Sequence, residues 1–304
     1  MSLIEHLKSI KIFAYIWRRI RHCLIVRKQK KVSRLCCSLI NDYYSGKIEH
    51  INFTPKRKMQ SPYIIWQYWG QGFDEQNLPE LVKICFDSID RCKGTCEVIR
   101  LCDNNISDYL DLPLFVKQRK EHFSKTFFSD LLRLCLLTAY GGVWIDATVL
   151  LTKPLPDRFF KYDYFMFQRD DNETDKKYWE NAFAAYWGWD KSFKVRCLNS
   201  VFFAQKGCSL VVGLTNMLLH VWKECEAIPY YFFFQILYQE VIQIKPDYRC
   251  PIESDCNIHL LQQIVYDNYD KISWDKVLSY GIHKLSYKAQ NLDRLKEIIK
   301  TCQS

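Results

Sequence analysis

The strongest constraint on the fold of this chain is a helical segment that passes through two glycines into a β-rich segment. Residues 127–140 carry apolar side chains at helical spacing, and the glycines at 141 and 142 form a helix stop signal. Residues 143–151 are rich in β-branched side chains and predict a strand. Alternation along such a strand places three residues on one side: Trp144, Asp146 and Thr148.

Helical and extended patterns also alternate upstream of this unit. The aromatic run 63–69, bounded by Pro62 and Gly70, predicts a buried first strand. A helix is expected over 78–91 and a second strand over 98–102. This alternation predicts an α/β fold with a mostly parallel sheet, and ligands bind such sheets beyond the carboxyl ends of the strands.

Charge divides the chain into an arm and a body. Residues 1–60 hold 14 Lys and Arg against 3 Asp and Glu, a net charge of +11, whereas the whole chain has +9. We therefore expect a basic helical arm at 1–60, an α/β domain at 61–288 and a C-terminal helix at 289–304. The 14 cysteines are scattered and lack the paired spacing of a zinc site, so we interpret them as reduced thiols.

Apolar residues of the arm recur three and four positions apart, which places them on one helix face. They are Ile10, Phe13, Trp17, Ile20 and Leu24. This stripe, within residues 1–35, either lies on an anionic membrane surface or packs on the protein's own body. Charges interrupt every apolar run before the ~20 residues that a membrane span needs, and no cleavage site follows an uncharged core. We expect a cytoplasmic protein, peripheral to the inner face of the cell membrane.

Two charged residues share one face of the helix at 127–140. Asp130 and Arg133 stand at positions i and i+3 among apolar neighbours. They form either a simple intrahelical ion pair or a pair that meets a ligand. Asp146 also has two interpretations: a turn or capping residue, or an acid that binds a ligand at the end of a strand.

The order of these residues resembles a known family. Asp130-Leu131-Leu132-Arg133, Tyr140-Gly141-Gly142-Val143-Trp144-Ile145-Asp146 and Lys153-Pro154-Leu155 are similar to the core of the capsular polysaccharide synthesis glycosyltransferases. That family is related to the DxD-motif sugar-binding enzymes, which include mannosyltransferases and the glucosylating domains of large clostridial toxins. The resemblance extends over the first strand and over residues 199–207 and 283–288.

The resemblance implies a GT-A type fold, in which a Rossmann-like nucleotide-binding sheet joins a mixed acceptor-binding half. It implies a retaining enzyme that moves a hexose or N-acetylhexosamine from a nucleotide sugar, with UDP favoured, to a lipid-linked oligosaccharide in bacterial capsule or other surface polysaccharide synthesis. Trp66 and Gln67 would help to form the nucleotide pocket. Asp130 and Arg133 would contact the ribose and the sugar. Trp144 would flank the nucleotide, and Asp146 would lie at the diphosphate.

A divalent cation, Mn²⁺ or Mg²⁺, is the usual partner of a departing diphosphate, and the resemblance places it at Asp146 and His283. This chain departs from the family pattern, because Thr148 stands where a second Asp is usual and a hydroxyl is the weaker ligand. Three alternatives follow: a metal held by Asp146, His283 and water; a metal-independent enzyme that uses Lys284 or another cation; or a non-catalytic sugar-binding relative. Asn199 loosely matches the position where retaining enzymes place an amide near the reacting carbon, or it caps a turn.

Partners other than the donor follow from the remaining patterns. The aromatic runs at 178–189 and 230–234 either stack on acceptor sugars or pack in the core. No nucleic-acid motif accompanies the basic arm, so we expect no nucleic-acid partner. A toxin-like enzyme that modifies a protein side chain is the main alternative, but the basic arm and the lack of delivery segments favour a lipid-linked acceptor.

Overall fold

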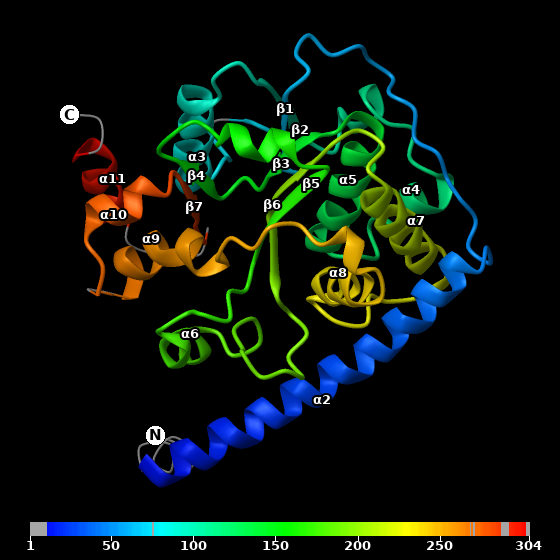
Figure 1. Cartoon of the computed structure of the whole chain (residues 1–304). Helices are drawn as coiled ribbons and strands as arrows, with labels where there is room; N and C mark the ends of the chain where they lie inside the picture. The colour runs from blue at the N-terminus through cyan, green and yellow to red at the C-terminus, as the bar shows by residue number, and fades with distance from the viewer. Residues whose placement is uncertain (1–10, 75, 268, 270, 287–291, 302–304) are drawn as a thin grey trace.

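The structure is a computed structural model that describes residues 11–74, 76–267, 269, 271–286 and 292–301. Within these residues, five strands form a central sheet in the order β2-β1-β3-β6-β5 (Figure 1). They are β1 (Ile64–Tyr68), β2 (Glu97–Leu101), β3 (Gly142–Ile145), β5 (Tyr164–Gln168) and β6 (Cys197–Ala204). All residues of β1, β3, β5 and β6 are buried, as in a sheet that is covered on both faces.

The sheet is parallel on one side and antiparallel on the other. β1 pairs in parallel with β2 and β3, whereas β6 runs antiparallel to β3 and β5. The predicted parallel arrangement therefore holds only for β2-β1-β3, and the prediction was wrong for β6 and β5. The connection 169–196 leaves the end of β5 and enters β6 at the same edge of the sheet, which makes these two neighbours antiparallel.

Helices and a second, two-stranded sheet surround the central sheet. α5 (Lys125–Tyr140) packs on β1, β3 and β6, and α8 (Phe233–Ile244) packs on β6. β4 (Val149–Leu151) and β7 (Ile282–Lys284) pair antiparallel, between α3 (Glu80–Cys92) and α9 (Asp255–Asp267). The remaining described elements are η1 (Ile106–Asp108), α4 (Leu114–Arg119), η2 (Asp157–Lys161), α6 (Lys176–Ala182), α7 (Ser209–Glu224), η3 (Pro246–Tyr248), α10 (Trp274–Ser279) and α11 (Leu292–Thr301).

The double glycine brings α5 and β3 close to the rest of the sheet. Gly141 and Gly142 have φ of +72° and +100°, a region that side chains with a Cβ rarely adopt. A Cβ at Gly141 would lie 2.5 Å from the backbone nitrogen of Lys206, and one at Gly142 would lie 2.5 Å from the carbonyl oxygen of Ile64. The glycines therefore both stop the helix and let β3 approach β1.

The segment expected to be one strand over 143–151 is two strands. β3 ends at Ile145, and residues 146–148 turn the chain into β4. Strand alternation is therefore not what groups Trp144, Asp146 and Thr148. Trp144 contacts Asp146 directly, and Asp146 and Thr148 are joined through the ammonium of Lys284.

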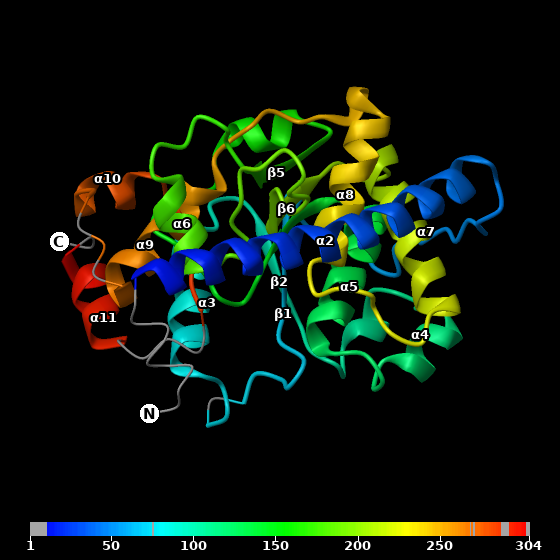
Figure 2. The same cartoon turned by 90° about the horizontal axis from the view of Figure 1, so that it is seen from below.

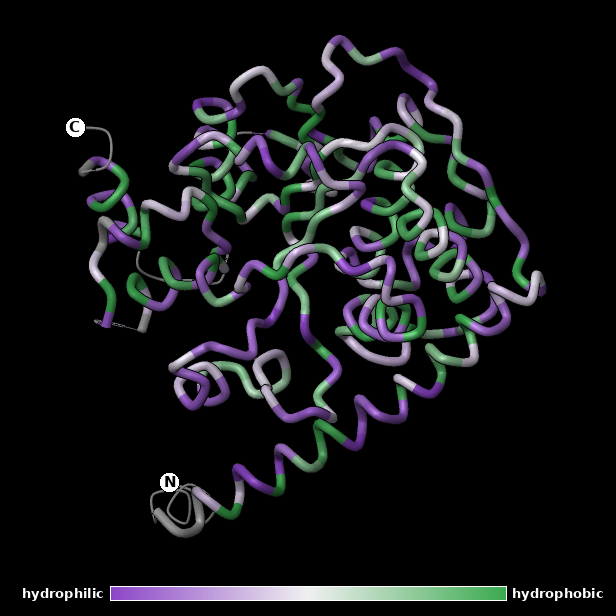
Figure 3. The backbone as a smooth tube through the Cα atoms, viewed as in Figure 1, coloured by the Kyte–Doolittle hydropathy of each residue, from purple (hydrophilic) through white to green (hydrophobic). Residues whose placement is uncertain are grey.

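The long helix α2 (Lys11–Tyr44) crosses the outside of the molecule (Figures 1 and 2). The helix packs on α7 and α8, Val32, Cys36 and Ile40 of its second half are buried, and the Ser33 hydroxyl donates to Glu240 at 2.8 Å. Hydrophilic and hydrophobic residues alternate along the helix (Figure 3). In the described part of the chain, no helix is both long enough and apolar enough to cross a bilayer.

Candidate active site

The turn after β3 carries the acid around which the site is built. The carbonyl oxygen of Asp146 accepts from the Val149 N–H at 2.9 Å, and its own N–H donates to the Ser200 carbonyl at 2.9 Å. These bonds anchor Asp146 beyond the carboxyl end of β3, beside β6. α/β sheets bind their ligands at this edge.

Three side chains donate to the Asp146 carboxylate. Oδ1 accepts from Arg133 Nη2 at 3.1 Å and from Trp144 Nε1 at 2.8 Å. Oδ2 accepts from Lys284 Nζ at 3.2 Å, and the same ammonium donates to Thr148 Oγ1 at 2.6 Å. The Arg133 guanidinium also lies over the Trp144 ring, 4.9 Å from its centroid. α5, the turn and β7 thus converge on one carboxylate.

Opposing effects set the charge of Asp146. Burial raises its pKa, but the cations of Lys284 and Arg133 outweigh burial and lower the pKa to about 2. Asp146 is therefore ionised at neutral pH. The side chains of Lys284 and Asp146 are 20% and 24% exposed, whereas that of Arg133 is 3% exposed. A ligand therefore reaches Lys284 and Asp146 first, with Arg133 beneath them.

A buried polar chain supports Arg133 from below. Arg133 Nη1 donates to Asp130 Oδ1 at 2.6 Å, and Asn199 Nδ2 donates to the same oxygen at 2.8 Å. Gln235 Nε2 in turn donates to Asn199 Oδ1 at 3.0 Å. Burial raises the pKa of Asp130, against the opposing effects of Arg133 and Asn199. The structure thus brings Asp130, Arg133 and Asn199 together with Asp146.

Trp66 and Gln67 bond to partners other than Asp146, although Trp66 pairs with Trp144 in the sheet. Trp66 is fully buried, and its indole N–H donates to the Gly141 carbonyl at 2.9 Å, at the opposite end of β3 from Asp146. Gln67 is also fully buried, and its Oε1 accepts from Arg100 Nε at 3.1 Å. A strand that is covered on both faces buries both of its sides, so neither side chain lines an open pocket here.

His283 and Lys284 are neighbours on β7 and point to opposite sides of it. Lys284 pairs with Val149 and reaches the Asp146 turn, whereas His283 pairs with Leu150. The His283 ring is fully buried, its Nε2 lies 3.1 Å from Thr152 Oγ1, and burial lowers its pKa to about 3. His283 is therefore neutral and turned away from Asp146.

The side chains around Asp146 do not fit a divalent-metal site. Such a site needs several oxygen or nitrogen ligands with available lone pairs. Asp146 Oδ1 accepts two hydrogen bonds, and the Lys284 ammonium lies against both Asp146 Oδ2 and Thr148 Oγ1, where a metal ion would bind. Over the described ranges, no three His, Cys, Asp or Glu side chains gather in a way that could hold a metal.

Two polar residues near the site were not predicted from the sequence. Gln235 and His259 are polar residues within the apolar helices α8 and α9, which is a weak signal. His259 Nδ1 lies 2.8 Å from the Asp255 carbonyl and so donates to it, which leaves Nε2 as an acceptor. Burial lowers the pKa of His259 to about 4, and the cation of Lys284 contributes to this shift.

Most rings of the two aromatic runs belong to the core. Trp179, Tyr186, Trp187 and residues 232–234 are buried. Tyr186 and Trp187 pack against the guanidinium of Arg169, which is fully buried with Asp255. Two rings are exposed, Phe183 at 47% and Tyr231 at 57%, and both contact Phe232.

The comparison with known families covers nearly the whole chain. Residues 18–301 match the family described as "Capsular polysaccharide synthesis protein". The chain belongs to this family. The resemblance drawn from the sequence motifs is thereby confirmed, and the matched range contains the whole Asp146 site.

Two named proteins are similar to this member of the capsular polysaccharide synthesis family. The O-glycosyltransferase PaGT of Phomopsis amygdali is 24% identical over 169 residues, which cover 52% of this chain and 38% of PaGT. The match thus spans about two fifths of the length of that relative. Among solved structures, the PaToxG glycosyltransferase has a TM-score of 0.34 and 12% identity, with 94% of this chain and 96% of that chain covered.

Proposed function

We propose that this member of the capsular polysaccharide synthesis family is a GT-A type glycosyltransferase. It moves a hexose or N-acetylhexosamine from a UDP sugar to a lipid-linked oligosaccharide during synthesis of a bacterial capsule or another surface polysaccharide. The supporting observation is the accessible Asp146–Lys284 pair, with Arg133 beneath it, beyond the carboxyl end of β3. Family membership and the similarity to an O-glycosyltransferase also support it.

The chemistry of sugar transfer explains why cations gather here. When the bond between the sugar and the diphosphate breaks, negative charge develops on the diphosphate, and cations fixed in position stabilise that charge. The Lys284 ammonium is the accessible cation of the site, and Arg133 adds a buried one. Asp146 holds both cations in place. Among the described residues, Arg133 Nε and Gln235 Oε1 are two of six buried side-chain polar atoms without a hydrogen-bond partner, so both can bind a polar ligand.

The stereochemical part of the proposal is retention of the anomeric configuration, with the Asn199 amide near the reacting carbon. Asn199 is 8% exposed and both ends of its amide are engaged, by Asp130 and Gln235. Its orientation is therefore set before a donor binds. ¹H NMR of the first-formed product tests this: a product with the donor's anomeric configuration supports retention, and the opposite anomer refutes it.

The donor assignment is tested by hydrolysis of a panel of UDP and GDP sugars with the purified full-length chain. We expect slow release of UDP from at least one donor, and a loss of roughly a hundredfold or more in Asp146→Asn. Asp108→Asn is the matched control, because Asp108 lies 3.1 Å from Arg57, the same distance as between Asp146 and Arg133, but on the surface. Equal activity of both variants, or no donor hydrolysed at all, would contradict the proposal.

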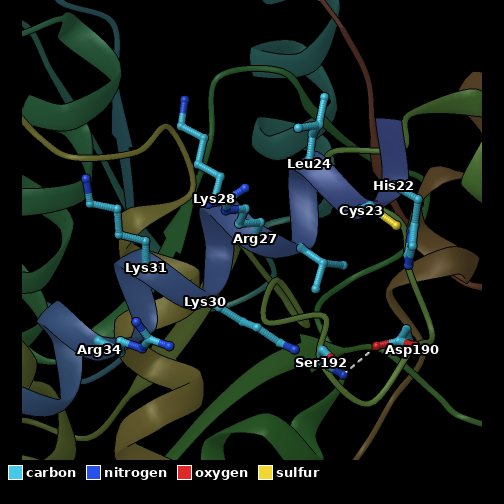
Figure 4. A pocket seen from close by; sticks show the side chains of 11 residues that line it. His22, Cys23, Leu24, Arg27, Lys28, Lys30, Lys31, Arg34, Asp190 and Ser192 are labelled. Atoms are coloured by element: carbon cyan, nitrogen blue, oxygen red, sulfur yellow. Dashed lines mark hydrogen bonds between the residues drawn. The ribbon is translucent and has the colours of Figure 1, made fainter. Parts of the chain in front are cut away.

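The membrane part of the proposal rests on the first half of α2. Trp17, Ile20 and Leu24 are 47%, 47% and 60% exposed, and this exposure supports contact of the stripe with a surface outside the protein. Ile10 lies outside the described residues. Basic side chains fan out around the adjacent turns, with Lys28 and Lys31 on one side and Lys30 and Arg34 on the other (Figure 4). Exposed apolar side chains among basic ones are typical of helices that lie on anionic membranes.

The exposed aromatic rings connect this surface with the site. Tyr231 packs near Phe127, one turn before Asp130 on α5, and Lys28 of α2 lies 5.3 Å from the ring centroid of Tyr230. Exposed rings can stack on the apolar faces of sugars. We infer that the oligosaccharide part of the acceptor lies over Phe183 and Tyr231 while α2 rests on the inner face of the membrane.

Sedimentation with phosphatidylglycerol vesicles tests the membrane part. We expect the full-length chain to bind at low salt and Leu24→Ser to bind more weakly. Leu114→Ser is the matched control, because Leu114 is 68% exposed on a different surface. Substitutions are preferable to deletion of the arm, since Val32, Cys36 and Ile40 of α2 belong to the core. Absence of vesicle binding at low salt, where surface attraction is strongest, would contradict the proposal.

A further inference from the structure

The position between Asp146 and Thr148 is occupied by an ammonium group. Lys284 Nζ lies 3.2 Å from Asp146 Oδ2 and 2.6 Å from Thr148 Oγ1. A metal ion that bridged these two side chains would have to occupy the same place. Two of the three ammonium protons point at these acceptors, which leaves one for a phosphate oxygen.

The backbone fixes Lys284 at this point. β7 pairs with β4 immediately after the turn, with Lys284 opposite Val149, and the Leu285 N–H donates to the Thr148 carbonyl at 2.9 Å. Lys284 is therefore attached to the turn by strand pairing on both sides of its own position. Strand pairing fixes the backbone, and the hydrogen bonds to Asp146 and Thr148 fix the ammonium, so little reorganisation is needed when a ligand arrives.

Residue 148 decides which cation this position favours. With Asp at 148, two carboxylates would face the same point, and a divalent ion would neutralise them. With Thr148, a single carboxylate, Asp146, faces the ammonium of Lys284 and the guanidinium of Arg133. The Lys284 ammonium at this point repels a second cation, and the side chain expected to help bind a metal, His283, is buried on the other side of β7.

We propose that Lys284 replaces the divalent metal in this enzyme and is the cation that binds the donor's diphosphate. This inference rests on the proposed function. In the transfer, the bond between the anomeric carbon and the diphosphate oxygen breaks, and its electron pair stays on the diphosphate. The acceptor oxygen forms the new bond to the anomeric carbon, and its proton passes to the diphosphate. Lys284 donates a hydrogen bond to the departing diphosphate and keeps its proton throughout.

A titration with Mn²⁺ alone, followed by electron paramagnetic resonance, tests the site without any donor. We expect the full-length wild-type chain to leave Mn²⁺ in solution. The Thr148→Asp/Lys284→Ala double variant should bind Mn²⁺ roughly tenfold or more tightly than wild type, because it restores two carboxylates and removes the ammonium. Wild-type binding as tight as that of the double variant would overturn the inference.

Donor hydrolysis in excess EDTA tests the chemistry. We expect wild-type activity to be unchanged by EDTA and by added Mn²⁺, Lys284→Arg to keep part of it, and Lys284→Ala to lose roughly a hundredfold. Activity that disappears in EDTA and returns with Mn²⁺ would overturn the inference and leave the proposed function intact. If no donor is hydrolysed, the proposed function fails, and the Mn²⁺ titration still decides whether Lys284 excludes a metal.

Discussion

Removing the charge of Asp146 tests the electrostatic description of the site most directly. In Asp146→Asn the shape is nearly unchanged, but the side chain no longer carries the charge that Arg133 and Lys284 surround. The pKa of Asp146 falls from its ordinary value of 3.8 to about 2. Each unit of difference corresponds to about 1.4 kcal/mol, so the ionised carboxylate stabilises the fold by about 2 kcal/mol at neutral pH.

The sign of the pH dependence follows from the direction of the shift. Because the pKa is lower in the folded state, the stabilisation is fully present above pH 3.8 and is lost as the pH falls toward 2. The difference in unfolding free energy between wild type and Asp146→Asn should therefore be about 2 kcal/mol at pH 7 and about half of that at pH 3. Arg133 keeps Asp130 as a partner at 2.6 Å, which explains a cost below that of a fully broken buried pair.

Urea unfolding followed by circular dichroism measures this difference at each pH. Asp108→Asn is again the matched control, and we expect it to cost less than about 1 kcal/mol, because its ion pair is exposed. The reasoning is refuted if Asp146→Asn is as stable as wild type at pH 7. It is also refuted if the cost of the substitution is the same at pH 3 as at pH 7.

Two further predictions concern the frame of the site. Gly142→Ala should destabilise the fold by at least about 3 kcal/mol, because the added Cβ would meet the Ile64 carbonyl. Gly207→Ala, at φ +72° with open space around it, should cost about 1 kcal/mol. Equal costs of the two variants in urea unfolding would contradict the close approach of β3 to β1. Trp66→Phe should lose the hydrogen bond to Gly141 and about 1–2 kcal/mol of unfolding free energy. Its affinity for UDP, measured by calorimetry, should stay unchanged. A large loss of UDP affinity would instead place Trp66 in the nucleotide pocket.

The local part of the site could be predicted from the sequence. Asp130 and Arg133 lie one helical turn apart, and the glycines and β3 carry the chain directly from that helix to Asp146. Because only the two glycines and β3 separate the helix from Asp146, few arrangements of this segment are possible, and they bring Asp130 and Arg133 close to Asp146. The helix, its glycine stop and the first strand follow from periodicity and turn chemistry for the same reason.

The choice between His283 and Lys284 could not be predicted. They are adjacent in the sequence and lie more than a hundred residues from Asp146, and a shift of one residue in the β4–β7 register would exchange the sides they face. Whether Trp66 faces a ligand could not be predicted for a related reason. A strand that is buried on both faces shows no alternation of polar and apolar residues to indicate which side meets a ligand.

The sequence by itself determined the helix with its glycine stop, the first strand, the family and the acid at the centre of the candidate site, because these depend on local patterns and short connections. Tertiary structure alone decided that an ammonium lies between Asp146 and Thr148, that His283 is turned into the core, and that Trp17, Ile20 and Leu24 of α2 are exposed while Val32 and Ile40 are covered. Each of these depends on which distant segment packs against which face. Packing between distant segments depends on the whole chain, so no local pattern specifies it.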